Sequence, residues 1–188
     1  MGIVTLVIGV VLVLYIIMLY NSLVSIKNNV SKAWANIEIL LKQRHDELPK
    51  LIDTCKQYMQ YEQDTLEKVM LARSQVSNAQ QSHDVRALGS AEGSLRAGLG
   101  KLFAVAEAYP ELKANENFLH LQSRISGLEN AIADRREFYN ESVNINNVRI
   151  EQFPDLLVAK LFNFPAFELL RFSSEELKDI DIGQRFNS

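Results

Sequence analysis

The chain has 188 residues, a formal net charge of −3 and a hydrophobic fraction of 47%. A slightly acidic chain has no bulk electrostatic attraction to nucleic acid, so its charge argues against a DNA- or RNA-binding protein. The single cysteine, Cys55, excludes an intramolecular disulfide framework and fits a reducing compartment.

Residues 3–20 form an almost uninterrupted apolar run without a charged side chain. A helix of that length covers about 27 Å, close to the ~30 Å hydrocarbon core of a bilayer. A cleaved signal peptide would need a basic start and a small-residue cleavage site, and the run has neither. The sequence therefore predicts an uncleaved transmembrane anchor over residues 1–22, with the lipid bilayer as a partner.

The flanks of this run differ in charge. No Lys or Arg precedes it, whereas Lys27, Lys32, Lys42 and Arg44 follow it. Because cytoplasmic flanks carry the excess of cations, we expect the N-terminus outside the cell and the bulk of the chain in the cytoplasm.

Apolar residues beyond the anchor recur at alternating spacings of three and four, which is a heptad pattern. This pattern predicts an all-α fold in which the transmembrane helix continues into a bundle of three long helices over residues 23–152. The pattern keeps its phase through Pro49, from Trp34 to Val76. We therefore expect one helix from the membrane to about residue 80, bent at the proline.

The polar segment 78–84 is typical of a turn, and its Ser82 or Asp84 can cap a second helix over about residues 85–108. Glycines in this helix indicate either a loose helix start or sites of close helix approach: Gly89, Gly93, Gly98 and Gly100. Tyr109 precedes a proline and should end the helix, because that position disfavours the α region.

Asn115 can cap a third helix that runs from residue 116 to about residue 152. Its second half carries asparagines along one face: Asn140, Asn144 and Asn147. These amides fit either a solvated face or a polar seam buried between helices, which would fix the register at some cost in stability.

Glu62 and Arg73 occupy heptad positions where apolar residues are expected. On one helix they would lie about 16 Å apart, too far for a mutual salt bridge. We therefore predict a polar seam in which Glu62 is buried and both residues meet polar groups of other helices. The remaining candidates for this seam are Glu107, Arg135, Arg136 and Asn140. The nearby run Arg44-His45-Asp46-Glu47 is expected to be a solvated turn, because consecutive helix residues fan out.

Residues 153–188 begin with an apolar segment and end in a polar tail, where Ser173 is suited to cap a short helix. A contiguous apolar patch of this size must be covered by the bundle, a second subunit or a membrane. We expect a short helix over residues 155–162 and a homo-oligomer that uses this segment. The predicted interface residues are Phe153, Leu157, Leu161, Phe162, Phe164 and Phe167. The alternative is an interfacial helix on the lipid surface.

The chain resembles the LemA family of bacterial membrane proteins, through motifs that include RHDELPKLI, AEAYPELKANENFL and FPDLLVAKLFNF. Typical members read closer to RHDLIPNLV, and have HE where this chain has Tyr61-Glu62. The resemblance implies a single N-terminal transmembrane helix and a domain of long antiparallel helices. The family has no agreed activity or catalytic residues, so the resemblance implies no mechanism.

The three histidines have no metal-ligand spacing, and no nucleophile stands near a base at a recognisable spacing. We therefore expect no metal, no cofactor and no enzymatic activity. The sequence favours a membrane-anchored helical scaffold that self-assembles or docks other membrane proteins. The alternatives are a ligand-binding or enzymatic module with a polar pocket around Glu62, Arg73 and Glu107, and an accessory subunit in membrane-protein quality control or envelope signalling.

Overall fold

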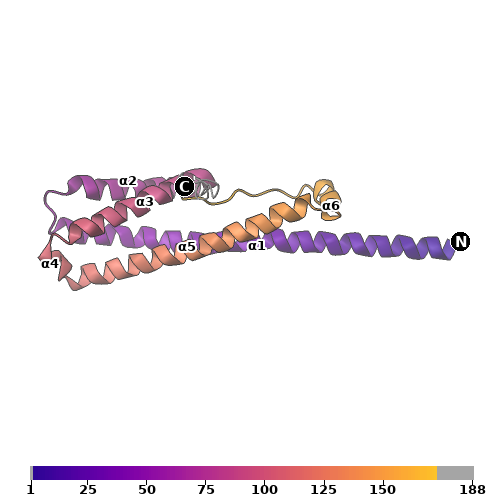
Figure 1. Cartoon of the computed structure of the whole chain (residues 1–188), viewed down its shortest axis with the longest axis horizontal. Helices are drawn as coiled ribbons and strands as arrows, with labels where there is room; N and C mark the ends of the chain where they lie inside the picture. Colours follow the sequence, from indigo (N-terminus) through magenta and orange to yellow (C-terminus); the bar gives the residue numbers. More distant parts are fainter. Residues whose placement is uncertain (1, 173–188) are drawn as a thin grey trace, which may run out of the picture. The chain divides into compact units, whose positions relative to one another are not determined.

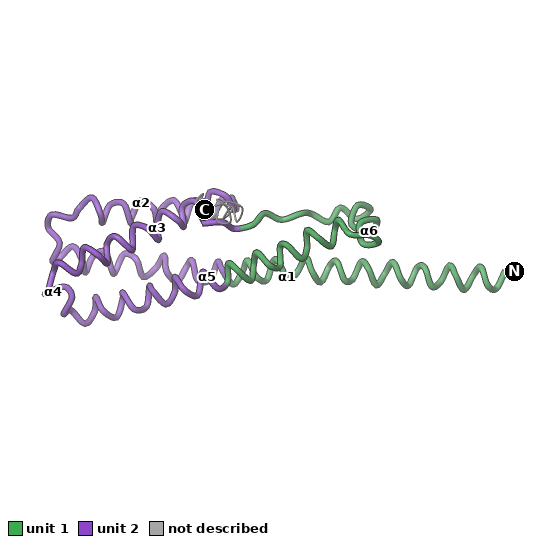
Figure 2. Tube along the Cα trace, in the orientation of Figure 1, with its two compact units in different colours: residues 1–36, 135–169 green, residues 37–134, 170–188 purple. Residues whose placement is uncertain are grey.

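The structure, a computed structural model, describes residues 2–172. Every regular element in this part of the chain is a helix, which confirms the all-α fold (Figure 1). The elements are α1 (Gly2–Lys56), α2 (Gln63–Gln81), α3 (Val85–Ala106), α4 (Pro110–Lys113), α5 (Glu116–Glu151) and α6 (Asp155–Leu161). The chain divides into two compact units, residues 1–36 with 135–169 (unit 1) and residues 37–134 with 170–188 (unit 2), coloured separately in Figure 2.

Unit 2 contains α1 from residue 37 to its end, all of α2, α3 and α4, and the first half of α5 (Figure 2). Each long helix directs apolar residues at three- and four-residue spacings into a common interior. Buried examples are Leu41, Leu48 and Ile52 on α1, Leu66 and Val69 on α2, Leu95 and Leu99 on α3, and Ile125 and Ile132 on α5. The heptad pattern therefore marks the core faces correctly.

The prediction of one helix to about residue 80 is wrong, because α1 ends at Lys56 and α2 begins at Gln63. Pro49 lies inside α1, as expected. The turn itself contributes Met59 to the core, with 2% of its surface exposed, and the Met59 amide donates to the Cys55 carbonyl at 2.9 Å. An apolar residue at a heptad position can therefore lie in a turn, so continuous phase does not prove a continuous helix.

Two of the predicted helix caps are confirmed. The Asp84 carboxylate accepts from the Ala87 amide at 2.9 Å at the start of α3, and the Asn115 side chain accepts from the Phe118 amide at 3.0 Å at the start of α5. The turn before α3 is shorter than the predicted segment 78–84, because α2 continues to Gln81.

Unit 1 contains the first part of α1, the second half of α5, and α6 (Figure 2). Leu23 of α1 packs with Val158 and Ala159 of α6 in a small core, which Leu19, Ile150 and Phe164 extend. The short helix expected over residues 155–162 is thus present and ends one residue earlier. The predicted cap Ser173 lies outside the described residues.

The N-terminal part of α1 is long and apolar enough to cross a membrane. An 18-residue window has a mean hydropathy of 3.0, and none of it is buried within the protein. By length and composition, this part of the helix matches the predicted anchor.

Candidate functional site

A buried ionic cluster connects three helices of unit 2. Arg44 of α1 has 1% of its surface exposed. Its Nη2 donates to Glu92 on α3, and its Nη1 donates to Glu129 on α5. The Arg96 Nε lies 3.9 Å from the other Glu129 oxygen, nearer the surface. One guanidinium therefore pairs with two carboxylates inside the unit.

Burial and charge act against each other in this cluster. Burial raises the pKa of the Glu92 carboxyl, and the positive charge of Arg44 opposes that rise. Burial also lowers the pKa of Arg44, but the two carboxylates more than offset this and the net shift is upward. Buried charges of this kind specify how helices align, and removing one partner leaves the other uncompensated.

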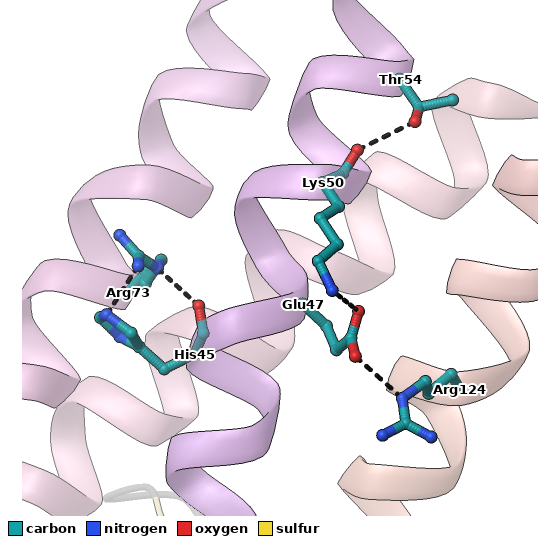
Figure 3. Close-up of polar contacts among 6 residues, drawn as sticks. All are labelled: His45, Glu47, Lys50, Thr54, Arg73 and Arg124. Atoms are coloured by element: carbon teal, nitrogen blue, oxygen red, sulfur yellow. Dashed lines mark hydrogen bonds and ion pairs between the residues drawn. The ribbon is translucent and has the colours of Figure 1, made fainter.

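Arg73 of α2 contacts His45, the residue that follows Arg44 on α1 (Figure 3). Its Nε donates to the His45 carbonyl at 3.0 Å, and its Nη2 lies 2.6 Å from the imidazole Nε2. Because a guanidinium can only donate, Nε2 must accept, which places the ring proton on Nδ1 of a neutral imidazole. Burial, followed by the charge of Arg73, lowers the pKa of His45 and favours this neutral form.

Glu47 is held between two cations (Figure 3). It accepts from Lys50 at 3.1 Å and from the Arg124 Nε of α5 at 3.0 Å. The Lys50 hydrogen bond lowers the pKa of the Glu47 carboxyl, burial opposes this, and Arg124 adds to the lowering. An open groove of about 490 Å³ adjoins these groups, with Asn117 and His120 also in its lining.

The expectation of a solvated turn at residues 44–47 is wrong for three of its four residues. Consecutive residues do point in different directions around α1, but several helices of unit 2 pack against different sides of α1. Arg44 thus meets α3 and α5, while His45 meets α2 and Glu47 meets α5. Only Asp46 remains largely exposed, with 56% of its side chain accessible and Lys42 as its partner.

Within unit 2, the candidates Glu62, Arg73 and Glu107 of the predicted polar seam have separate surroundings. Glu62 is half-buried at the N-cap of α2 and makes no side-chain capping bond, so the expectation of full burial is wrong. Arg73 is engaged by His45, and Glu107 is exposed and pairs with Lys113 of α4.

The other three seam candidates lie on the part of α5 that belongs to unit 1: Arg135 is exposed, and Arg136 and Asn140 are half-buried. Sequence reasoning missed Glu92 and Glu129 as the partners of Arg44.

Two asparagines of α5, Asn146 and Asn147, bind the backbone of the C-terminal segment within unit 1, whereas Asn144 of the predicted asparagine face is exposed. Asn147 donates to the Phe167 carbonyl at 2.9 Å and accepts from the Phe167 amide at 3.0 Å. Asn146 donates to the Pro165 carbonyl at 3.0 Å, and the Tyr139 hydroxyl donates to the Glu168 carbonyl at 3.0 Å. Burial raises the pKa of Tyr139 to about 12, so it stays a donor at neutral pH.

The predicted interface residues fall into two groups. Phe164 and Phe167 are half-buried, and Phe164 packs against the small core of unit 1. The others are exposed: Phe153 by 78%, Leu157 by 61%, Leu161 by 72% and Phe162 by 51%. The exposed group lies on and beside α6.

Comparisons with known proteins identify relatives of this chain. The LemA family model matches residues 33–183. The chain belongs to the LemA family. Protein LemA of Metamycoplasma hominis is 29% identical over 169 residues, which cover 89% of this chain and 75% of that protein. The family resemblance is therefore confirmed.

Two magnetosome proteins are similar to a shorter part of this LemA-family chain. MamQ 1 and MamQ 2 of Paramagnetospirillum magneticum are each 32% identical over 83 residues, 44% of this chain. The match spans 30% of the length of each MamQ protein. Together with the apolar start of α1, the relatives support a membrane-associated helical protein.

Proposed function

We propose that this LemA-family protein is a membrane-anchored, non-enzymatic helical scaffold that self-assembles or docks partner proteins at the cytoplasmic membrane. The observation that carries the proposal is α1, a single 55-residue helix. Its first part is apolar and exposed, and its later part supplies Leu41, Leu48 and Ile52 to a protein core. The chain therefore leaves the bilayer as a helix and not as a flexible linker.

The contacts of the charged side chains inside unit 2 support a structural role. Arg44 pairs with two carboxylates, and His45 contacts Arg73. Glu47 pairs with Lys50 and Arg124. General acid or base catalysis needs a titratable group that faces a substrate and can exchange its proton there. In this cluster the titratable groups instead connect α1 to α2, α3 and α5.

Self-assembly is supported by an exposed apolar stripe on α5 in unit 1. Phe138, Ile145 and Val148 are 48%, 47% and 42% exposed. Their spacing of seven and three residues places them on one helical face. Such a face can pack against a helix of another chain, which gives the scaffold a protein-binding surface.

Light scattering of the full chain in detergent, corrected for bound detergent, tests this proposal. We expect an oligomer that dissociates when Phe138→Ser is combined with Ile145→Ser. The matched control is Leu119→Ser, which removes an equally exposed apolar side chain elsewhere on α5. A monomeric wild-type protein would contradict self-assembly, and an oligomer that survives the double substitution would exclude the α5 stripe.

The ligand-binding alternative would use the groove beside Glu47. Lys50, Arg124 and His120 line it and offer hydrogen-bond donors to an anionic group. Thermal unfolding with added phosphate or a short dicarboxylate tests this alternative. A stabilisation that disappears in Arg124→Gln would favour a ligand-binding module.

A further inference from the structure

Helix α6 is attached to α1 where the apolar run of α1 ends. Val158 and Ala159 of α6 share a core with Leu19 and Leu23 of α1. The Tyr20 ring lies 4.8 Å from the Phe162 ring, centroid to centroid, in an edge-on contact. Within unit 1, the position of α6 along α1 is therefore defined by residues 19–23.

A polar contact fixes the start of α6 at the same level. The Arg149 Nη2 of α5 donates to the Asp155 carboxylate at 3.1 Å and to the Ser22 hydroxyl at 3.2 Å. Asp155 is buried and is the first residue of α6. Arg149 therefore joins α1, α5 and α6 at one point, just beyond the apolar run.

This level corresponds to the edge of a bilayer. If residues 3–20 cross the hydrocarbon core, Tyr20 lies where aromatic rings with a polar tip prefer to be, at the interface. Because α6 contacts Tyr20, Leu19 and Leu23, α6 must lie at the same depth. Its outer surface then faces the boundary between headgroups and acyl chains.

The outer surface of α6 is apolar. Leu157 and Leu161 of α6 expose 61% and 72% of their surface, and Phe153 before the helix and Phe162 after it expose 78% and 51%. We call these four residues the α6 stripe. Lys160 is exposed next to the stripe, and a lysine there can extend its charge toward lipid headgroups.

We propose that the α6 stripe inserts into the lipid bilayer, so that α6 is an interfacial helix beside the transmembrane helix. This inference rests on the proposed membrane anchoring. Lipid is the occupant because the stripe continues the exposed apolar surface of α1 across Tyr20, whose own surface is 38% exposed. The exposed apolar surface of α1 and the α6 stripe would then together hold α1 at a defined depth in the bilayer.

Spin labels on the full chain in lipid nanodiscs test the insertion. Single cysteines are placed at Val10, Leu157, Leu161 and Glu137 in a Cys55→Ser background. Collisions with apolar oxygen are compared with collisions with a water-soluble nickel chelate. We expect oxygen to dominate at Val10, Leu157 and Leu161, and the chelate to dominate at Glu137. The control Glu137 is exposed on α5, about 20 Å along the helix from Ile150.

Each other outcome has a defined meaning. Chelate-dominated labels at Leu157 and Leu161, with Val10 in lipid, would overturn the inference and leave the anchor in place. Labels at those two positions that meet neither reagent and broaden one another would show a second copy on the stripe and would also overturn it. A chelate-dominated label at Val10 would contradict the anchoring itself.

Discussion

Arg44 is a charged side chain in the interior of unit 2, and its presence there depends on Glu92 and Glu129. A buried guanidinium is stable only while carboxylates compensate its charge, and a buried carboxylate likewise depends on its cation. The same reasoning applies to His45, which faces Arg73 only as a neutral imidazole. These two contacts therefore determine how the stability of this protein responds to mutation and to pH.

Arg44→Met should destabilise the protein by about 3–5 kcal/mol at neutral pH, because it leaves Glu92 and Glu129 without their main partner. Burial already raises the pKa of Glu92, and without Arg44 less opposes that rise. A group with a raised folded-state pKa stabilises the fold at low pH and loses this effect as pH rises. The deficit of the variant should therefore shrink on acidification from pH 7.5 to pH 5.

Thermal unfolding in detergent, followed by circular dichroism, measures this deficit. Lys42→Met on the same helix is the matched control and should cost about 0–1 kcal/mol, because the Lys42 side chain is 74% exposed. Equal melting temperatures for the two variants would show that the cluster does not stabilise the fold.

The contact of His45 with Arg73 predicts a second pH-dependent stability difference. Burial and the charge of Arg73 lower the pKa of His45 below its ordinary value of about 6.5. A lowered histidine pKa contributes stability above that ordinary value, which is lost as pH falls through the folded-state value. The stability difference between wild type and His45→Gln should therefore shrink from pH 7.5 to pH 5. A difference that is independent of pH would contradict the contact, and Arg73→Gln should weaken the trend.

Local polar contacts could be predicted from the sequence, whereas distant ones could not. Asp84 and Asn115 bond to amides three residues away, so the cap pattern alone identifies them. The partners of Arg44 lie 48 and 85 residues away, and no spacing in the sequence relates them. When other helices pack against several sides of a helix, a charged residue on that helix can be buried although the sequence suggests that it is solvated.

The C-terminal segment depends on features of two helices, α5 and α3. In unit 1, Asn147 of α5 binds both backbone groups of Phe167. In unit 2, Gly89 of α3 admits the backbone of Arg171, since a Cβ at Gly89 would lie 1.9 Å from the Arg171 oxygen. Of the two sequence interpretations of the glycines, close approach applies at Gly89, although the neighbour is a segment without regular secondary structure and not a helix.

Gly89→Ala and Gly100→Ala should shift the melting temperature in opposite directions. A methyl group at Gly89 must displace the Arg171 backbone, which should lower stability and speed hydrogen exchange at the Phe167 amide. Nothing lies within 4 Å of a Cβ at Gly100, so alanine there should gain up to about 1 kcal/mol of helix propensity. Stabilisation by both substitutions would show that the segment does not pack on α3.

The element boundaries show which signals the sequence carries. The starts of α3, α5 and α6 follow from caps and prolines near the expected positions. The end of α1 does not, because Met59 fills a core position from within the turn. Hydrophobic periodicity records burial, which a turn and a helix can share.

We propose that α1 anchors the protein in the membrane and that its helical units lie in the cytoplasm. Lys27 and Lys32 follow the apolar run, and α6 brings the exposed Lys160 to the same end of it. An excess of cations on this side predicts that the helical units lie in the cytoplasm.

Labelling of sealed membrane vesicles with an impermeant maleimide tests both the anchor and the orientation. The label is a Tyr61→Cys substitution in a Cys55→Ser background, since Tyr61 lies in the turn between α1 and α2 with 91% of its surface exposed. We predict that the protein sediments with the vesicles and is labelled in inside-out vesicles but not in right-side-out vesicles. Labelling in right-side-out vesicles would contradict the orientation, and loss of the protein from the vesicle pellet would contradict the anchor.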